Sequence, residues 1–403
     1  MALASTSLVN VRAILESTFG ETPVAGNPTV LRITGESLSY DISKKTSDQI
    51  NSTRTVSSMV ATNATVTGGI TQEIHYSGID PFMESTLQST FTEFGTNGVG
   101  AATSTSSITT TEITAAAPTA GANIFTALKK GQWFRITSAG ANNGKILRVS
   151  TTTAPTTTVI TLDANTPAAA STGESIQIQA SRLTHGTTQT SWTIEKEAND
   201  IGVFLAFKGC TPSKMSMKIA SGSLSTVSFD FMGKSALEDT ATMLPGTPVA
   251  APTYDIHSGV SGATNAVWMD GVPLSGTYVK SVSLDFDNAL RSQEAIGTLG
   301  AVAIGSGTIQ CKASVEIYFA DKDLFTKYRS NTYSSLIFAT TDSSGNGYMV
   351  TLPVVNIDSW KSNAGGKDQD QMISMSLTAL SDDSNADATL RKCIFIDRIG
   401  VAA

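Results

Sequence analysis

Ionised side chains are scarce in this sequence. Only 15% of the 403 residues are Asp, Glu, Lys or Arg, against about 25% in an average soluble domain. A surface with so few charges is not kept in water mainly by ionised groups, so we expect much of it to face other protein. The net charge of −7 argues against a protein that grips nucleic acid through its phosphates.

Long apolar runs and cysteines are also rare. No apolar run reaches the roughly 18 residues that a transmembrane helix needs, and the first residues lack the basic and apolar regions of a secretory signal peptide. We therefore expect neither a membrane span nor secretion. The three cysteines, Cys210, Cys311 and Cys393, are far apart and form no C-x-x-C motif. This pattern is typical of reduced thiols in a protein assembled in the cytoplasm.

Motifs of catalysis and metal binding are missing. The three histidines, His75, His185 and His257, are far apart and belong to no zinc-binding pattern. We expect His75 on the polar face of a strand, as an ordinary surface or interface residue. Residues 140–145 resemble a phosphate loop only weakly, and residues 382–383 fit a solvated acidic turn better than a calcium site. No catalytic, cofactor-binding or metal-binding residues are predicted.

The residues that are present favour β structure, because Thr, Val and Ile are abundant. Strands are predicted at residues 29–34 and 37–41, followed by an exposed loop at 43–54 and an alternating strand at 70–76. Asp80-Pro81 then predicts the start of a short helix. A further short helix is predicted at residues 8–19.

An internal repeat is the most informative feature of the chain. The matched segments are 37–41 with 283–287, 71–76 with 314–319, and 227–231 with 373–377. In the second match Glu73 falls on Glu316, and each copy continues into a short helix that begins at Asp80 or Asp323. The repeat predicts two domains of similar topology.

A segment of different composition interrupts the first copy. Tracts rich in Thr, Ala and Ser flank it, and such tracts favour flexible connections. Inside it, short strands are predicted at 133–136, 145–149, 157–162 and 175–179. We expect a small inserted β domain.

Several runs of the sequence resemble one protein family. They are ESTFGETP at 16–23, LRITGESL at 31–38, the loop at 43–54, SWTIEK at 191–196, FKG at 207–209, KMSMK at 214–218 and SFDFMG at 228–233. In this order they are similar to the tail tube (major tail) proteins of long-tailed, non-contractile bacteriophages. The resemblance covers roughly residues 8–100 and 190–380 and does not extend to the inserted segment.

The resemblance implies an all-β fold with short helices, in which duplicated tail-tube β-sandwich or barrel domains carry the small inserted β domain. The expected parts are an N-terminal arm at 1–28, a first domain at 29–102 and 188–250, the insert at 103–187 on the exterior, a second domain at 251–381 and a C-terminal arm at 382–403. It also implies a structural, non-enzymatic protein of the virion tail.

The resemblance implies that copies of the chain form rings that stack into a tube. Two tail-tube domains per chain would close with three chains, giving threefold symmetry that is nearly sixfold. The expected partners are a tape-measure protein in the lumen, a tail terminator and a distal tail protein, and DNA would pass through the lumen without specific binding.

Candidate residues follow from this arrangement. Glu73, Glu316 and Asp230 are candidates for acids that line the lumen, because each lies on the polar face of an expected strand. The alternative places this face on the outside or against a neighbouring subunit. Lys44, Lys45 and Arg54 are candidates for contacts between rings, and their alternative is a solvated loop.

Two other classes of function stay open. A β-rich, Thr-rich chain is also typical of a host-surface adhesin or receptor-binding protein of the virion, and a capsid or tail-terminator protein is a third class. The duplication favours a ring over both.

Overall fold

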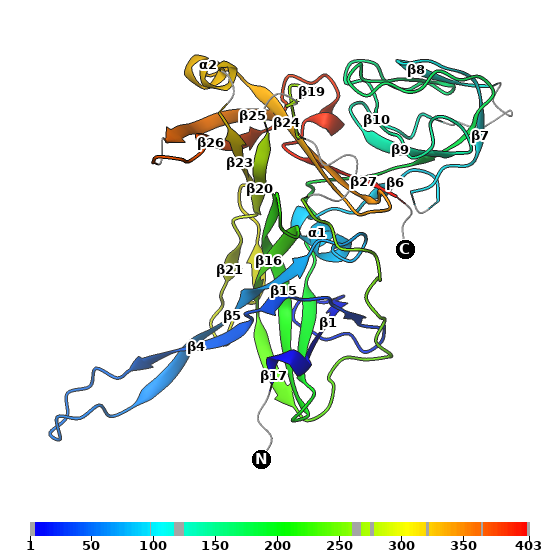
Figure 1. Cartoon of the computed structure of the whole chain (residues 1–403). Helices are drawn as coiled ribbons and strands as arrows, with labels where there is room; N and C mark the ends of the chain where they lie inside the picture. The colour runs from blue at the N-terminus through cyan, green and yellow to red at the C-terminus, as the bar shows by residue number, and fades with distance from the viewer. Residues whose placement is uncertain are drawn as a thin grey trace.

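The computed structural model describes residues 5–96, 98–116, 125–259, 267–274, 278–319, 322–363 and 366–400 (Figure 1). Strands dominate, and the α-helices in these ranges are α1 (Asp80–Leu87) and α2 (Asp323–Ser330), each following its expected strand. The predicted all-β fold class is confirmed. Neither described helix is long and apolar enough to cross a membrane.

The remaining elements in these ranges are strands (β) and short 3₁₀-helices (η). They are η1 (Thr6–Leu8), β1 (Val9–Leu15), β2 (Thr29–Val30), β3 (Gly35–Glu36), β4 (Ser39–Thr46), β5 (Met59–Glu73), β6 (Thr92–Glu93), β7 (Thr103–Ile108), β8 (Glu112–Ala115), β9 (Trp133–Ser138), β10 (Ile146–Arg148), β11 (Val159–Thr161), β12 (Ser175–Gln179), β13 (Ser181–Thr184), β14 (Trp192–Ala198), β15 (Val203–Ala220), β16 (Thr226–Gly233), β17 (Ser235–Asp239), β18 (Val267–Met269), β19 (Val272–Pro273), β20 (Val279–Asp287), β21 (Arg291–Gln293), β22 (Ala303–Gly305), β23 (Gln310–Tyr318), β24 (Ser334–Thr341), β25 (Gly347–Asn363), β26 (Met372–Leu380), η2 (Ala388–Leu390) and β27 (Phe395–Ile399).

The main sheet contains the same ladder twice. In the first copy β5 lies between β4 and β16, and β16 also pairs with β15. In the second copy β23 lies between β20 and β26, and β26 also pairs with β25. The last strand of each ladder has a register shift at the same place, between Pro212 and Lys214 in β15 and between Ile357 and Ser359 in β25. The repeat in the sequence is therefore a repeat of topology.

The ladders correct one detail of the predicted match. Ser228 pairs with Thr71, and its repeat equivalent Ser374 pairs with Glu316. Glu316 thus corresponds to Thr71, whereas Glu73 lies two residues further along β5. Because side chains alternate along a strand, a shift of two residues keeps the side chain on the same face. Both glutamates lie on one face of the sheet, although not at equivalent positions.

The two copies join edge to edge within the chain. Residues 214–220 of β15 pair with residues 281–287 of β20, so one sheet runs from β4 through both copies to β25. Side chains on its inner face, among them Ile70, Phe229, Phe286 and Met375, belong to a single hydrophobic core. Burial of this shared core stabilises the two copies together.

The insert forms a separate sheet with its own core. The four strands predicted for it are confirmed as β9, β10, β11 and β12, and together with β7 and β8 they give the order β10-β9-β12-β7-β8-β11. Its core includes Phe134, Ile136 and Ile160. The chain enters and leaves side by side, because Val99 pairs with Gln179.

Some local predictions are wrong. Within the segment 8–19, residues 9–15 form strand β1, which pairs along its whole length with β14, instead of a helix. The expected loop at 43–54 begins as strand, because β4 continues to Thr46 and pairs with β5. The expected C-terminal arm contains β27, which is buried and pairs with both β13 and β25. In each case pairing with another strand decides the local conformation.

Candidate functional site

One face of the main sheet is polar across both copies. Glu73 pairs with Thr226 and Asp230 pairs with Gly69 in the first copy, while Glu316 lies opposite Ser374 in the second. The alternate residues of the same strands point into the core. The three acidic candidates therefore lie on one face of one continuous sheet, on the side away from the core.

Lysines lie among these acids. Lys214 Nζ is 3.0 Å from Asp287 Oδ2, and this hydrogen bond raises the pKa of Lys214. Lys280 Nζ is 3.5 Å from Glu316 Oε1, and Lys312 lies on the same face. Exposed pairs of this kind add little stability. The face thus has charges of both signs and is not uniformly acidic.

Each end of the ladder sheet has an edge without a strand beside it. Along residues 359–363, β25 pairs with β26 alone in the described part of the chain. At the other end, β4 pairs with β5 alone among the strands described. Such edges are templates for pairing with another chain.

Aromatic side chains gather beside the free edge of β25. Phe325 of α2 lies 4.9 Å from Trp360 of β25, measured between ring centroids, and Phe319 also contacts Trp360. Phe325 is 41% exposed. Its repeat equivalent in α1, Phe82, is 2% exposed and packs against Trp192. The second copy therefore leaves apolar surface open where the first copy is covered.

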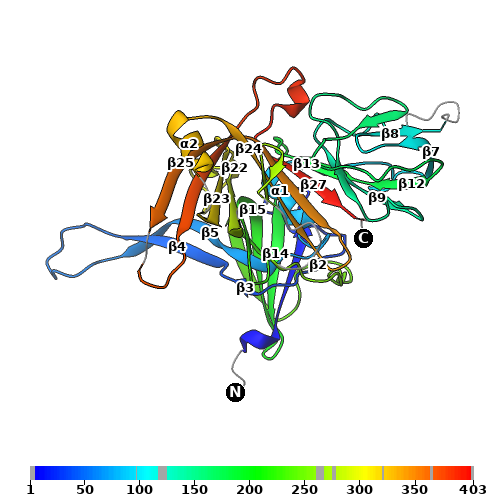
Figure 2. The same cartoon turned by 45° about the horizontal axis from the view of Figure 1, so that its top comes forward.

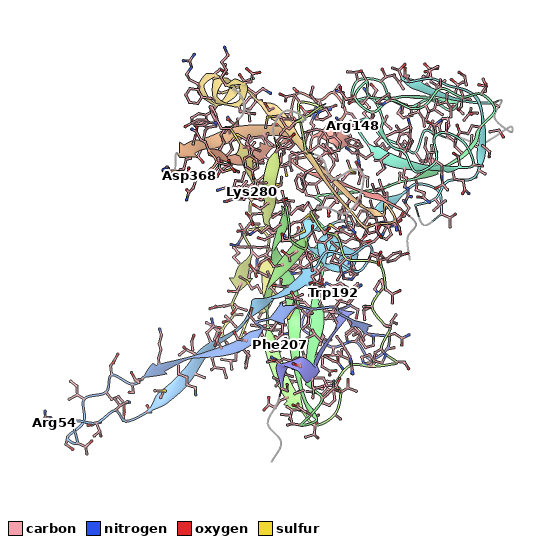
Figure 3. All side chains as sticks on the ribbon, viewed as in Figure 1. Arg54, Arg148, Trp192, Phe207, Lys280 and Asp368 are labelled. Atoms are coloured by element: carbon pink, nitrogen blue, oxygen red, sulfur yellow. The ribbon has the colours of Figure 1, made fainter. Side chains whose placement is uncertain are left out.

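A long hairpin made by β4 and β5 projects away from the body of the molecule (Figure 1). Lys44 and Lys45 lie on β4, and Arg54 lies near the end of the hairpin (Figure 3). All three are exposed. Exposed apolar side chains also occur on this arm, among them Ile50, Val56, Met59 and Val60. An arm with this much exposed apolar surface is suited to contact with other protein.

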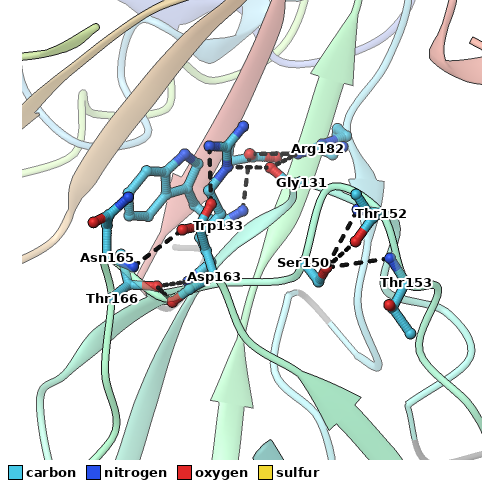
Figure 4. A network of polar contacts seen from close by, with 11 residues as sticks. Gly131, Trp133, Ser150, Thr152, Thr153, Asp163, Asn165, Thr166 and Arg182 are labelled. Carbon is cyan, nitrogen blue, oxygen red and sulfur yellow. Dashed lines mark hydrogen bonds and ion pairs between the residues drawn. The ribbon is translucent and has the colours of Figure 1, made fainter. Parts of the chain in front are cut away.

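The insert lies on the opposite side of the molecule from this arm (Figure 2). Arg182 of β13 donates from Nε to Asp397 Oδ1 at 2.6 Å and from Nη2 to the Gly131 carbonyl at 2.9 Å (Figure 4). The Trp133 backbone N–H donates to Asp397 Oδ2 at 3.0 Å, and the Trp133 ring packs 5.2 Å from that of Trp268. Through Gly131 and Trp133 the insert is fixed to β13 and β27 of the main sheet and to Trp268, which differs from the expected flexible tether.

A buried polar network lies where α1, β6, β25 and β27 meet. Arg398 of β27 donates to Asp80 Oδ2 and to Glu93 Oε1, each at 2.5 Å. Tyr348 Oη donates to Asp80 Oδ1 at 2.5 Å. Asp80 begins α1 as predicted. Its carboxylate also joins segments that are far apart in the sequence, and no local motif indicates this role.

His75 is better buried than expected. His75 is 1% exposed instead of lying on a polar surface, because β5 ends at Glu73 and the chain turns into the core. Burial lowers the pKa of His75 and lowers that of His257 to about 4. His185 contacts Cys393. In the described residues, no group of three or more His, Cys, Asp or Glu side chains could hold a metal ion.

Comparison with known proteins shows the family to which the chain belongs. No curated protein matches the chain. A profile of the family described as phage tail tube protein matches residues 6–379, which is nearly the whole chain and includes both copies of the ladder. Such a protein is a structural component of the virion tail that assembles into a tube. The chain belongs to the phage tail tube protein family.

Proposed function

We propose that three copies of this chain form a ring, that rings stack into the tail tube, and that the phage genome passes through the tube during ejection. The observation that carries the proposal is the junction between β15 and β20 inside the chain. This junction already joins two copies of the ladder edge to edge. The two remaining edges lie at opposite ends of the sheet, on β25 and β4. In the repeat, β25 is equivalent to β15 and β4 is equivalent to β20.

The pairing of β15 with β20 inside the chain predicts which residues of β25 and β4 lie opposite each other between chains. Ser216 pairs with Asp285 across β15 and β20. The repeat equivalents of these residues are Lys361 in β25 and Ser39 in β4. Lys361 of one chain then lies opposite Ser39 of the next, and the same register brings Trp360 to the neighbouring chain's Tyr40. The exposed aromatic surface beside Trp360 is covered by the neighbour in this arrangement.

The polar face of the sheet lines the lumen in this proposal, so Glu73, Asp230 and Glu316 face the DNA. Lysines interspersed with the acids reduce the charge of the lining, and DNA slides past without specific binding. The arm that carries Lys44, Lys45 and Arg54 contacts the adjacent ring, with charge complementarity supplying register more than affinity.

The insert lies on the exterior of the tube. The tape-measure protein, the tail terminator and the distal tail protein are the proposed partners, and assembly takes place in the cytoplasm of the bacterial host.

Disulfide trapping in assembled tubes tests the junction. Cysteines at Lys361 and Ser39 (Lys361→Cys, Ser39→Cys) should link neighbouring chains on mild oxidation, because directly opposed residues fit the span of a disulfide. The ladder of linked species on a non-reducing gel should end at three chains.

A shifted pair provides the control. Ser43 lies on the same strand as Ser39, roughly 13 Å further along, so Lys361→Cys with Ser43→Cys should not link. Equal linking of both pairs, or tubes that form without linking either, would overturn the register. A tube reconstruction with six chains per ring would contradict the three-chain ring.

A further inference from the structure

A polar cavity lies between the insert and the second copy. Its volume is about 540 Å³, which is within the range of small-molecule binding sites. The insert contributes Arg148 and Asp163 to its wall, the second copy contributes Tyr333 and Ser334, and the segment before β27 contributes Asp382. Figure 3 labels Arg148 at this junction. The cavity is thus built from segments that are far apart in the sequence.

Arg148 has fewer strong contacts than a buried cation needs. The residue is only 7% exposed. Its Nη1 is 3.4 Å from Asp163 Oδ2, and its Nε is 3.4 Å from the Gly131 carbonyl. Both distances exceed the roughly 2.7–2.9 Å of a charge-assisted hydrogen bond. Among the described residues Nη2 has no hydrogen-bond partner, so an acceptor in the cavity would complete the contacts of this guanidinium.

The other walls also have unused hydrogen-bonding groups. Ser334 Oγ of β24 and Thr351 Oγ1 of β25 are buried without a partner in the described part of the chain, and both residues line the cavity. Buried polar atoms without a partner are rare in proteins. On the C-terminal side, Asn385 Nδ2 donates to Asp382 Oδ2 at 3.2 Å. This pair and the pair of Arg148 with Asp163 each place a donor beside a carboxylate.

The charges of the cavity wall balance. The described wall has three cationic and three acidic side chains, which are Lys130, Arg148 and Arg182, and Asp163, Asp270 and Asp382. An ion of either sign would meet side chains of its own sign, so the wall suits a neutral ligand. Neighbouring hydroxyl groups match a donor that lies beside a carboxylate, because a hydroxyl both donates and accepts.

We propose that this cavity binds a neutral saccharide. One hydroxyl of a sugar accepts from Arg148 Nη2 while the adjacent hydroxyl donates to Asp163, and a second pair of hydroxyls meets Asp382 and Asn385. The C–H face of a sugar ring is apolar and packs against an aromatic ring, which the exposed Tyr333 supplies. The site lies within one chain and does not depend on how chains assemble.

The test is ligand-observed NMR on the folded, full-length chain, with D-glucose, D-galactose and N-acetyl-D-glucosamine as probes. Saturation transfer from the protein to at least one of these sugars is expected, and it should reach a plateau as the sugar concentration rises. Inorganic phosphate, followed by the broadening of its phosphorus signal, is the probe for an anion site. The absence of transfer to all three sugars, or phosphate that displaces the bound sugar, would overturn the proposal.

Two variants locate the bound sugar. Arg148→Met removes a charged donor and should weaken binding at least about tenfold. Tyr333→Ala removes an exposed ring, so the fold should persist, and binding should weaken at least about twofold, the lower range for an aromatic contact. Tyr278→Ala, at an exposed tyrosine that lines a different cavity, is the matched control and should leave the affinity unchanged. Unchanged affinity in both Arg148→Met and Tyr333→Ala would place the sugar elsewhere and reject the site.

Discussion

Arg398 holds a charge in the interior of the molecule, where its guanidinium meets the carboxylates of Asp80 and Glu93. Both Arg398 and Asp80 are almost completely buried, at 6% exposure each. Removal of one partner from a buried pair leaves the other charge without compensation, which costs far more than the loss of an exposed pair.

Arg398→Met should therefore lower the free energy of unfolding by about 3–5 kcal/mol, measured by urea denaturation of the unassembled chain. The matched control is Lys280→Met, which removes the exposed partner of Glu316 and should cost at most about 1 kcal/mol. Equal effects of the two substitutions would show that the Arg398 network does not hold the copies together.

His257 makes the stability depend on pH. Its pKa is lowered from 6.5 to about 4 because the imidazole is buried, with Nδ1 3.1 Å from Thr340 Oγ1. The unfolded chain therefore binds a proton in a pH range where the native chain does not. The resulting stability is fully present above the unfolded pKa and is lost as the pH falls from 6.5 toward 4.

The expected loss from this residue across that range is about 3 kcal/mol. Denaturant titrations at several pH values should show a smaller decline for His257→Gln than for the unaltered chain. The buried His75 shifts in the same direction, so some decline persists in the variant. Parallel pH profiles for the two proteins would contradict the assignment to His257.

At the scale of elements, Trp133 supplies the large apolar side chain in the contact between β9 of the insert and the second copy. Trp133 is 2% exposed and belongs to a separate apolar cluster with Trp268, Ile337 and Met349. The insert has its own core on its other side, so loss of this contact should loosen the docking without unfolding the insert.

Trp133→Ala should lower the free energy of unfolding by about 3–5 kcal/mol, as for other buried Trp side chains. The loss of stability should be confined to the strands around Trp133. Hydrogen exchange should accelerate in β9, β13 and β27 while β7, β8 and β11 keep their protection. Thr111→Ala, at an exposed turn of the insert, is the control and should change neither region. Acceleration throughout the insert would show that its fold depends on the docking.

The elements also show where local patterns are sufficient. Strands β9 to β12 of the insert were predictable because turn residues bound short runs rich in Val, Ile and Thr. Strands β7 and β8 were not predicted, because they lie in a tract rich in Thr, Ala and Ser that was expected to be a flexible connection. Residues 9–15 were not, since their apolar positions also suit a helix and only pairing with β14 makes them a strand. Intrinsic propensity is a weak guide wherever a distant strand supplies the hydrogen bonds.

For the whole molecule, the sequence was sufficient to predict the duplication, because equivalent strands keep similar alternating patterns. The sequence match aligned Glu73 with Glu316, which is wrong by two residues. A pattern that alternates every two residues fits equally well after a shift of two residues. The Arg182–Asp397 pair could not be predicted. Its partners are far apart in the chain, and no local pattern marks such a contact.

The junction between β15 and β20 has a consequence for how a ring responds to dilution. Its two strands are tethered by the connecting chain, so they meet at an effective concentration that does not change with the amount of protein in solution. The junction between β25 and β4 of different chains has no such tether and obeys mass action. In a three-chain ring every second lateral joint would thus be made during folding, and dilution could separate only the others.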